Sequence, residues 1–226
     1  MRATLGRLLP PTKLERDLAL QSVLSAFATG SFLTGTAVFF TEIVGLTGAQ
    51  IGLGMSISAA AALALQIPMG RLADQLGAKA LWVWSSALEA ALYFAWPAIG
   101  GMVAFVAMLS VMAIVETAGR NGRNVYRIAV FTRENRVAAM AYQRAARNVG
   151  YTLGAGASGV ALGIGLDAVR LIPLVTGLLL VLNAVLVATV LPVIARQVAT
   201  GAADDPATAA PPAWRNVGFE IGRAHV

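Results

Sequence analysis

Gly70-Arg71-Leu72-Ala73-Asp74-Gln75-Leu76-Gly77-Ala78-Lys79 is a polar stretch between two long apolar segments. Residues 51–69, which precede it, contain no charged residue, and residues 80–96, which follow it, contain only Glu89. A short polar connection between apolar segments of this length is typical of a tight turn at a membrane surface. We therefore interpret Gly70 to Lys79 as a turn between two membrane helices.

The composition points to the same class of protein. Hydrophobic residues make up 58% of the chain and charged residues 12%, with a mean hydropathy of +0.72. Soluble domains carry about a quarter of charged residues. The chain has no cysteine and one histidine, His225, which excludes disulfides, thiolate metal sites, cysteine nucleophiles and Ser-His-Asp triads. We expect a membrane protein with no metal site and no cofactor.

Long uncharged segments recur along the chain. Residues 18–40 contain no charged residue and, at about 1.5 Å per residue, can cross a hydrocarbon core of about 30 Å. Pro97 should end the third such segment, with Trp96 at the lipid interface. We predict an all-α, polytopic membrane helical bundle. Its six transmembrane helices are expected at residues 18–40, 51–69, 80–96, 98–115, 148–166 and 171–195.

The segments outside this bundle have different compositions. Residues 1–17 are basic and too interrupted for a signal peptide, so we interpret them as a cytoplasmic tail. Residues 196–219 are rich in alanine and proline and are expected to form a disordered cytoplasmic linker. Residues 220–226 look like the translation of a sequencing adapter, a suspected artefact. We therefore expect the natural protein to continue past Phe219.

The basic residues predict the orientation. With the amino terminus inside, Arg170 is the only one of the 17 Lys and Arg residues in an outer segment. Positively charged short loops stay in the cytoplasm, so we predict a multi-pass protein of the cell membrane with a cytoplasmic amino terminus. We therefore expect the net charge of +6 to favour contact of the protein with lipid headgroups, and we expect no nucleic-acid partner. The arginine-rich residues 116–147 are interpreted as an inner loop that determines topology and contacts anionic lipid. Its end, Arg144-x-x-Arg147-Asn148, is expected near the inner mouth of the pathway.

The stretch Gly70 to Lys79 follows the pattern G-x-L-A-D-x-x-G-x-[RK]. It resembles the loop signature of the major facilitator superfamily, which lies between the second and third helices of those transporters. Six helices with a long basic connection between the fourth and fifth are similar to one half of such a transporter, over residues 18–195. The resemblance implies a 3+3 inverted repeat and a chain truncated to its first half.

The resemblance also implies a gate at the signature stretch. Asp74, together with the basic residues Arg71 and Lys79, would latch the inner gate, in part through contacts to a second six-helix bundle. Gly70 and Gly77 would permit a positive φ and close backbone approach where one helix ends and the next begins. The alternative interpretation is an ordinary polar turn.

A second segment, Gly150-x-x-x-Gly154-Ala155-Gly156-Ala157-Ser158-Gly159, is similar to the antiporter signature G-x-x-x-G-P-x-x-G-G of the same superfamily. Ala155 stands where that signature has proline, and Ser158 replaces a glycine. Small residues at this spacing let membrane helices approach closely in any transport mode. We therefore interpret Gly150, Gly154 and Gly159 as a helix-packing motif.

Charged residues inside the apolar segments are candidates for proton or substrate contact. An ionised carboxylate at the position of Glu89 costs about 2.5–3.5 kcal/mol, so we expect it to face a cavity or to be protonated. The alternative is a carboxyl hydrogen-bonded to Ser85 or Ser86. Glu116 and Arg120 are spaced to pair on one helix face. The superfamily often keeps a functional arginine in the fourth helix, and the choice between Arg120 and Arg123 stays open.

Together these features favour a secondary active transporter that couples to protons, moves a small organic solute or drug, and works in efflux. No phosphate-cradling loop is present to drive transport with ATP, and no metal cluster or nucleophile with its base lies in the spans, so we expect no enzyme. The expected partners are the lipid bilayer, a small-molecule substrate, and a second six-helix bundle, either the missing carboxy-terminal half or another copy. The alternatives are a non-transporting scaffold or sensor of similar fold, and a homodimerising six-helix transporter.

Overall fold

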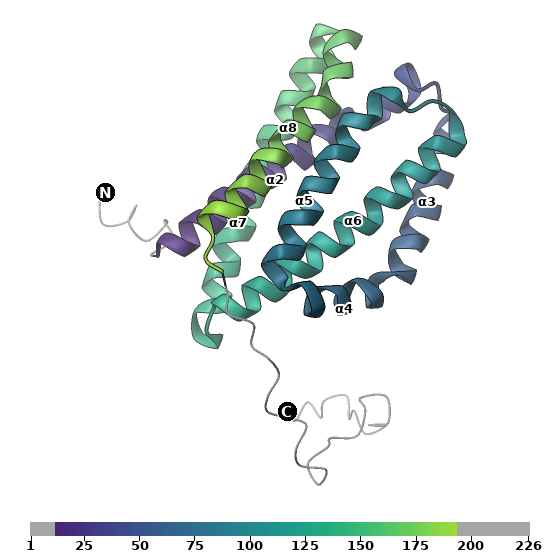
Figure 1. Cartoon of the computed structure of the whole chain (residues 1–226). Coiled ribbons are helices and arrows are strands. Elements are labelled where there is room, and N and C mark those ends of the chain that lie inside the picture. Colours follow the sequence, from purple (N-terminus) through teal and green to yellow (C-terminus); the bar gives the residue numbers. More distant parts are fainter. Residues whose placement is uncertain (1–11, 194–226) are drawn as a thin grey trace, which may run out of the picture. The chain divides into compact units, whose positions relative to one another are not determined.

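A computed structural model describes residues 12–193, where all regular structure is helical (Figure 1). The elements are α2 (Lys13–Val38), the π-helix η1 (Phe39–Ile43), α3 (Gly48–Ala64), α4 (Gln66–Leu76), α5 (Ala78–Ala95), the 3-10 helix η2 (Trp96–Ala98), α6 (Gly101–Val130), α7 (Arg133–Ile164) and α8 (Leu166–Val190). The predictions for residues 1–11, for the end of the sixth segment after 193, for the linker and for residues 220–226 lie outside the described range.

The first two helices begin at reciprocal side-chain caps. The Thr12 hydroxyl accepts from the backbone N–H of Glu15, and the Glu15 carboxylate accepts from the Thr12 N–H at 2.9 Å. Thr47 and Gln50 repeat the arrangement at the start of α3, with a 2.8 Å bond from the Thr47 N–H. Each pair satisfies backbone donors that have no partner within the helix. The caps explain why α2 and α3 begin before the first residues of the predicted apolar segments.

The second predicted helix is broken. Its two parts, α3 and α4, meet at Leu65 and are bent by 52°. Pro68 explains the break, because a proline ring clashes with the carbonyl four residues earlier, here Ala64, and has no N–H to donate. The helix resumes as α4 and continues to Leu76, so most of the stretch predicted as a tight turn is helical.

The long inner loop predicted between the fourth and fifth helices is also helical. α6 runs on to Val130 and α7 begins at Arg133, so only Phe131 and Thr132 separate them. The Arg136 side chain donates to the carbonyl oxygens of Ile128 (3.0 Å) and Phe131 (3.2 Å), which lie at the end of α6. A cation at this position satisfies carbonyls that have no partner within the helix.

Helix pairing follows a regular pattern in the described residues. α2 packs on α7, α3 packs on α6, and α5 packs on both α6 and α8 (Figure 1). α2 also contacts α8, and α4 crosses the ends of α5 and α6. If α3 and α4 are counted as one segment, the first three segments correspond in order to α6, α7 and α8. Under this correspondence the pair of α2 and α7 matches the pair of α6 and α3, and the pair of α5 and α6 matches the pair of α8 and α2. Two three-helix repeats would produce this pairing.

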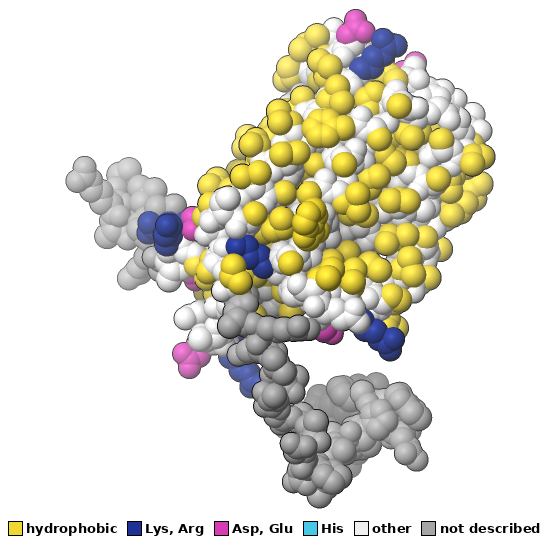
Figure 2. Space-filling model, in the orientation of Figure 1, with side chains coloured by type: hydrophobic (Ala, Val, Ile, Leu, Met, Phe, Trp, Pro, Cys, Tyr) yellow, Lys and Arg dark blue, Asp and Glu magenta, His cyan; other side chains and the backbone are white. Residues whose placement is uncertain are grey.

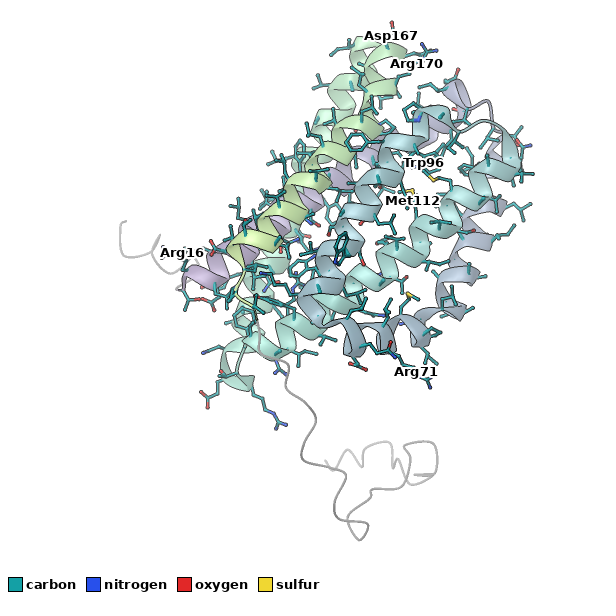
Figure 3. All side chains as sticks on the ribbon, in the orientation of Figure 1. Arg16, Arg71, Trp96, Met112, Asp167 and Arg170 are labelled. Carbon is teal, nitrogen blue, oxygen red and sulfur yellow. The ribbon has the colours of Figure 1, made fainter. Side chains whose placement is uncertain are left out.

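An aromatic cluster forms the largest part of the core. Phe32, Phe40 and Trp96 pack together, with the rings of Phe40 and Trp96 5.0 Å apart. The π-helix brings the neighbouring residues Phe39 and Phe40 to the interior, each 1% exposed. Trp96 was predicted at the lipid interface, but it is 0% exposed and its indole N–H donates to the Met112 sulfur at 3.1 Å (Figure 3). Its position is set by aromatic packing rather than by lipid.

The surface and the helix lengths fit a membrane-embedded protein. Three described helices are long and apolar enough to cross a membrane, namely Lys13–Ile43, α6 and α8, and the bent pair of α3 and α4 makes a fourth if it counts as one span. Three or four of the six predicted spans therefore meet this test of length and apolarity. Figure 2 shows apolar side chains over the middle of the visible face, with charged side chains toward the ends. Lipid can cover such a surface.

Candidate functional site: a polar cavity among five helices

In the signature stretch, Gly70 to Lys79, one residue connects two helices and another contacts α8. Gly77 has φ +87° and connects α4 to α5, as expected of a glycine where one helix ends and the next begins. Lys79 reaches α8, where its ammonium group donates to the carbonyl oxygens of Ala188 (2.9 Å) and Leu191 (2.5 Å). Arg71 and Asp74 lie on the exposed side of α4. Gly70 lies inside α4 with open space around it, so its expected role at a helix end is wrong.

Two of the three predicted packing glycines join α2 to α7. Gly150 and Gly154 are buried, and a side chain at either would collide with the backbone of α2, at Val23 and Phe27 respectively. Gly159 is exposed and has no neighbour within 4 Å, so its prediction as a packing residue is wrong. Small residues allow the close approach of α2 and α7. Gly159 lies on the other side of α7 and takes no part in that approach.

A cavity of about 350 Å³ lies among α2, α5, α6, α7 and α8. Most of its lining side chains are polar or charged, in a bundle whose surface is otherwise largely apolar. All four predicted proton or substrate contacts line it. The lining residues are Ser25, Ala26, Thr29, Trp82, Ser86, Glu89, Tyr93, Glu116, Gly119, Arg120, Arg123, Asn124, Arg127, Arg147, Tyr151, Leu180 and Asn183.

Helical periodicity explains why α6 contributes so many charges. Glu116, Arg120, Arg123 and Arg127 are spaced by four, three and four residues, which places them on one face. The Arg120 guanidinium lies 3.0 Å from the Glu116 carboxylate and also donates to the Thr117 hydroxyl at 3.0 Å. The expected pair of Glu116 and Arg120 is therefore present. Both side chains are about half exposed, at 52% and 49%.

Gly122 lets α6 approach α5 next to this charged face. A methyl group at Gly122 would lie 2.8 Å from the Ala78 carbonyl oxygen and 2.9 Å from the Trp82 nitrogen. The close approach brings the Trp82 and Glu89 side of α5 to the charged face of α6. Gly122 thus has a packing function beside the arginines of α6.

Glu89 projects from α5 into the cavity. The other charges that act on its carboxyl group are those of Glu116, Arg120 and Arg123 on α6. The alternative contact with a neighbouring serine is wrong in the described structure, because neither Ser85 nor Ser86 bonds to Glu89 within residues 12–193. The Ser86 hydroxyl instead accepts a 3.2 Å hydrogen bond from Asn183. Glu89 is left facing the cavity.

Hydrogen bonds fix the opposite wall. The Gln21 amide donates to Asn183 Oδ1 at 2.9 Å, and Asn183 in turn donates to Ser86. This chain joins α2, α8 and α5 through buried polar side chains. Such a chain holds Asn183 in one orientation at the edge of the cavity.

The arginines of residues 116–147 serve several purposes rather than one. Arg120, Arg123, Arg127 and Arg147 line the cavity, so their interpretation as a lipid-facing loop is wrong for these four residues. The Arg147 guanidinium lies 5.7 Å from the Tyr151 ring centre and donates to the Tyr151 hydroxyl at 3.3 Å. Arg147 thus lies at the cavity, and its expected place at the inner mouth of a pathway stays a prediction.

Sequence reasoning missed several cavity residues. Arg127 was counted only as one arginine of the basic stretch, although its spacing from Arg123 places it on the same helix face. Tyr151 follows Arg147 at the same spacing. Asn183 is a single polar residue within an apolar segment, a pattern that marks functional positions in membrane helices. These patterns become informative once the stretch is known to be helical.

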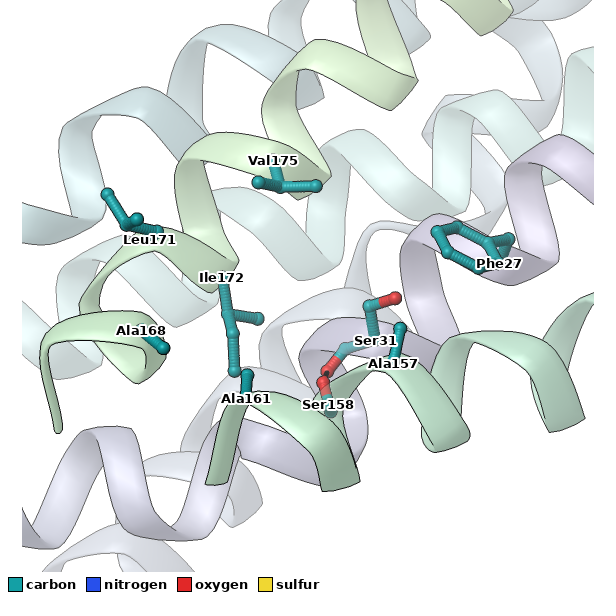
Figure 4. Close-up of a pocket in the computed structure, with 9 residues that line it drawn as sticks. All are labelled: Phe27, Ser31, Ala157, Ser158, Ala161, Ala168, Leu171, Ile172 and Val175. Atoms are coloured by element: carbon teal, nitrogen blue, oxygen red, sulfur yellow. Dashed lines mark hydrogen bonds between the residues drawn. The ribbon is translucent and has the colours of Figure 1, made fainter. Parts of the chain in front are cut away.

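A second cavity, of about 250 Å³, is almost wholly apolar (Figure 4). Phe27 and Ser31 of α2, Ser158 of α7 and Ile172 of α8 are among its lining residues. The Ser158 hydroxyl donates to the Ser31 carbonyl oxygen, which ties α7 to α2 at the cavity wall. No lining residue carries a charge. Within residues 12–193, no group of His, Cys, Asp and Glu side chains could hold a metal ion in either cavity.

Comparison with protein families decides the assignment. A model of the Major Facilitator Superfamily matches residues 18–219. The chain belongs to the Major Facilitator Superfamily. The matched range includes every residue of the polar cavity. Comparison with curated proteins found no match.

Proposed function

We propose that this chain is a secondary active transporter that moves a small organic solute through the polar cavity and couples the movement to protons. The observation that carries the proposal is the position of Glu89, a carboxyl group within an apolar helix that faces a cavity lined with polar side chains. Ionisable residues of membrane helices that face a cavity commonly serve transport pathways or proton relays. The membership in a transporter superfamily agrees with this use.

Glu89 is the proposed proton carrier because its surroundings can alternate. Arg120, Arg123 and Glu116 of α6 act on its carboxyl group, so a solute bound to the arginines would change the field at Glu89. Protonation of Glu89 would change the charge of the cavity by one unit, and this change would alter how the arginines bind a solute. The same residue would then link proton movement to solute binding.

We further propose that a second six-helix bundle completes the site, supplied either by a carboxy-terminal half of a longer chain or by another copy. Transporters built from repeats bind their substrates near the midplane, at the interface between the repeats. Several apolar side chains of the cavity helices are exposed, including Leu33 (66%) and Leu153 (55%), and they could be covered by either lipid or a partner bundle.

The proposed orientation places the amino terminus in the cytoplasm of the cell, with the chain in the cell membrane. The distribution of described charges supports it, because Arg16 and Arg71 lie at one end of the bundle and Asp167 and Arg170 at the other (Figure 3). The excess of basic residues at the first end follows the positive-inside rule. We propose efflux as the working direction.

The test is transport by the purified protein in sealed vesicles. Vesicles with an imposed pH gradient should accumulate a solute that binds the chain, and collapse of the gradient with a protonophore should stop the accumulation. Protease protection would show which side of the vesicle membrane the amino terminus faces. Solute measured separately inside and outside the vesicles would then give the direction of transport. Solute binding without movement, with or without the gradient, would contradict transport and would favour the non-transporting sensor.

A further inference from the structure

The charges that line the polar cavity do not balance. Four arginines line it, namely Arg120, Arg123, Arg127 and Arg147, against the two carboxylates of Glu89 and Glu116. The Glu116 carboxylate is already paired with Arg120. Three guanidinium groups therefore share the cavity with one remaining carboxyl group.

Two of these guanidinium groups have no hydrogen-bond or ion-pair partner among the described residues, 12–193. The Nε atoms of Arg123 and Arg127 are buried and have no hydrogen-bond acceptor among residues 12–193. Neither side chain forms an ion pair in that range, where the pairs are Arg120 with Glu116 and Arg170 with Asp167. Arg127 as a whole is only 8% exposed. A buried charge without a hydrogen-bonded counter-charge is costly, which favours an external anion as its partner.

The rest of the lining suits the organic part of such an anion. Trp82, Tyr93 and Leu180 provide apolar surface in the same cavity, while Tyr151 and Ser25 provide hydroxyl groups. A guanidinium group binds carboxylate and phosphate oxygens through paired N–H donors, with a geometry that a halide cannot use. The lining therefore combines an anion-binding side with an apolar side.

We propose that the solute of this cavity is a small organic anion whose carboxylate or phosphate group binds Arg123 and Arg127. This inference rests on the proposed transport function for its biological meaning, but the binding itself is independent of transport. The anion supplies the acceptors that the two arginines lack in the protein. Its apolar part lies against Trp82 and Leu180.

The experiment compares four aromatic probes of similar size and different charge. Phenyl phosphate, benzoate, benzamide and benzylammonium are titrated by calorimetry into the full chain in lipid nanodiscs at low salt. We expect phenyl phosphate and benzoate to bind at least about tenfold more tightly than benzamide, since charge-assisted hydrogen bonds are the strong ones. Benzylammonium should not bind.

Arg127→Gln and Arg123→Gln should each weaken the binding of both anions by about tenfold or more, and leave benzamide unchanged. Arg133→Gln is the matched control, because Arg133 is exposed and does not line the cavity. Melting temperatures of the variants are measured alongside, and Arg127→Lys replaces Arg127→Gln if the latter fails to fold. Lysine keeps the charge but loses the paired donors, so it should bind the anions more weakly than arginine.

Equal affinity for benzoate, benzamide and benzylammonium would overturn the inference, as would anion binding that survives both arginine substitutions. A failure of the proposed function gives a different result. In that case the anions bind through Arg123 and Arg127, but no anion enters or leaves sealed vesicles. Movement of benzylammonium in place of the anions would keep the transporter and reject the anionic solute.

Discussion

The ammonium group of Lys79, at the start of α5, lies 2.9 Å from the carbonyl oxygen of Ala188, near the end of α8. It also donates to the Leu191 carbonyl oxygen, just beyond that helix. The last carbonyls of a helix have no partner within it and carry partial negative charge, so a cation stabilises them. One residue of the signature stretch thus ties the third helical segment to the sixth.

Lys79→Gln should destabilise this junction. The substitution removes a charge-assisted contact with the end of α8 and should cost about 1 kcal/mol. The expected readout is a lower melting temperature and faster hydrogen exchange in the last turn of α8. Arg71→Gln is the matched control, because Arg71 is exposed on α4. Equal effects of the two substitutions would show that the contact with Ala188 contributes nothing.

Glu89→Gln tests the proposed proton coupling. The amide has nearly the same shape but cannot carry a proton, so solute accumulation driven by a pH gradient should fall to the level measured without a gradient. Binding of phenyl phosphate should persist or improve, since one negative charge has been removed next to the arginines. Glu42→Gln is the control, because Glu42 is exposed in η1 and does not line the cavity. Gradient-driven accumulation that survives Glu89→Gln would assign the coupling to another group.

A pair of glycine substitutions separates close packing from helix flexibility. Gly150→Ala should destabilise the protein by about 1–3 kcal/mol, because the new methyl group collides with the backbone at Val23. Gly159→Ala has open space around it and should be neutral or stabilising by up to about 1 kcal/mol, since alanine favours a helix more than glycine does. Thermal unfolding in detergent measures both. Similar losses at the two positions would contradict the close approach of α2 and α7.

Glu116→Gln separates stability from binding. The pair with Arg120 is half exposed, so its loss should change the free energy of unfolding by less than about 1 kcal/mol. Release of Arg120 and removal of one negative charge should strengthen the binding of phenyl phosphate by up to about tenfold at low salt. The gain should shrink as salt is added, because screening weakens the interaction. An unchanged anion affinity would mean that the charge of Glu116 does not affect the bound anion.

The sequence alone predicted much of the site. Glu116 and Arg120 were selected by their spacing, and Arg120 and Arg123 by the family resemblance. These three residues line one cavity with Glu89. Glu89 was selected because a charged residue is rare and costly in an apolar segment. That cost acts on each residue separately, so it can be read without knowing the fold. Arg127, which was missed, lies in a stretch whose polarity was interpreted as a loop.

The sequence by itself determined the membrane class, the family and the presence of charged residues in apolar helices, because hydropathy and short motifs are local properties. Only the tertiary structure decided which of these residues meet. It placed Arg127 and Arg147 in the same cavity as Glu89, put Trp96 in the aromatic core rather than at the lipid interface, and gave Gly154 rather than Gly159 the contact with α2. The physical reason is that a helix face acquires its role from the helix packed against it, and that partner lies far away in the sequence.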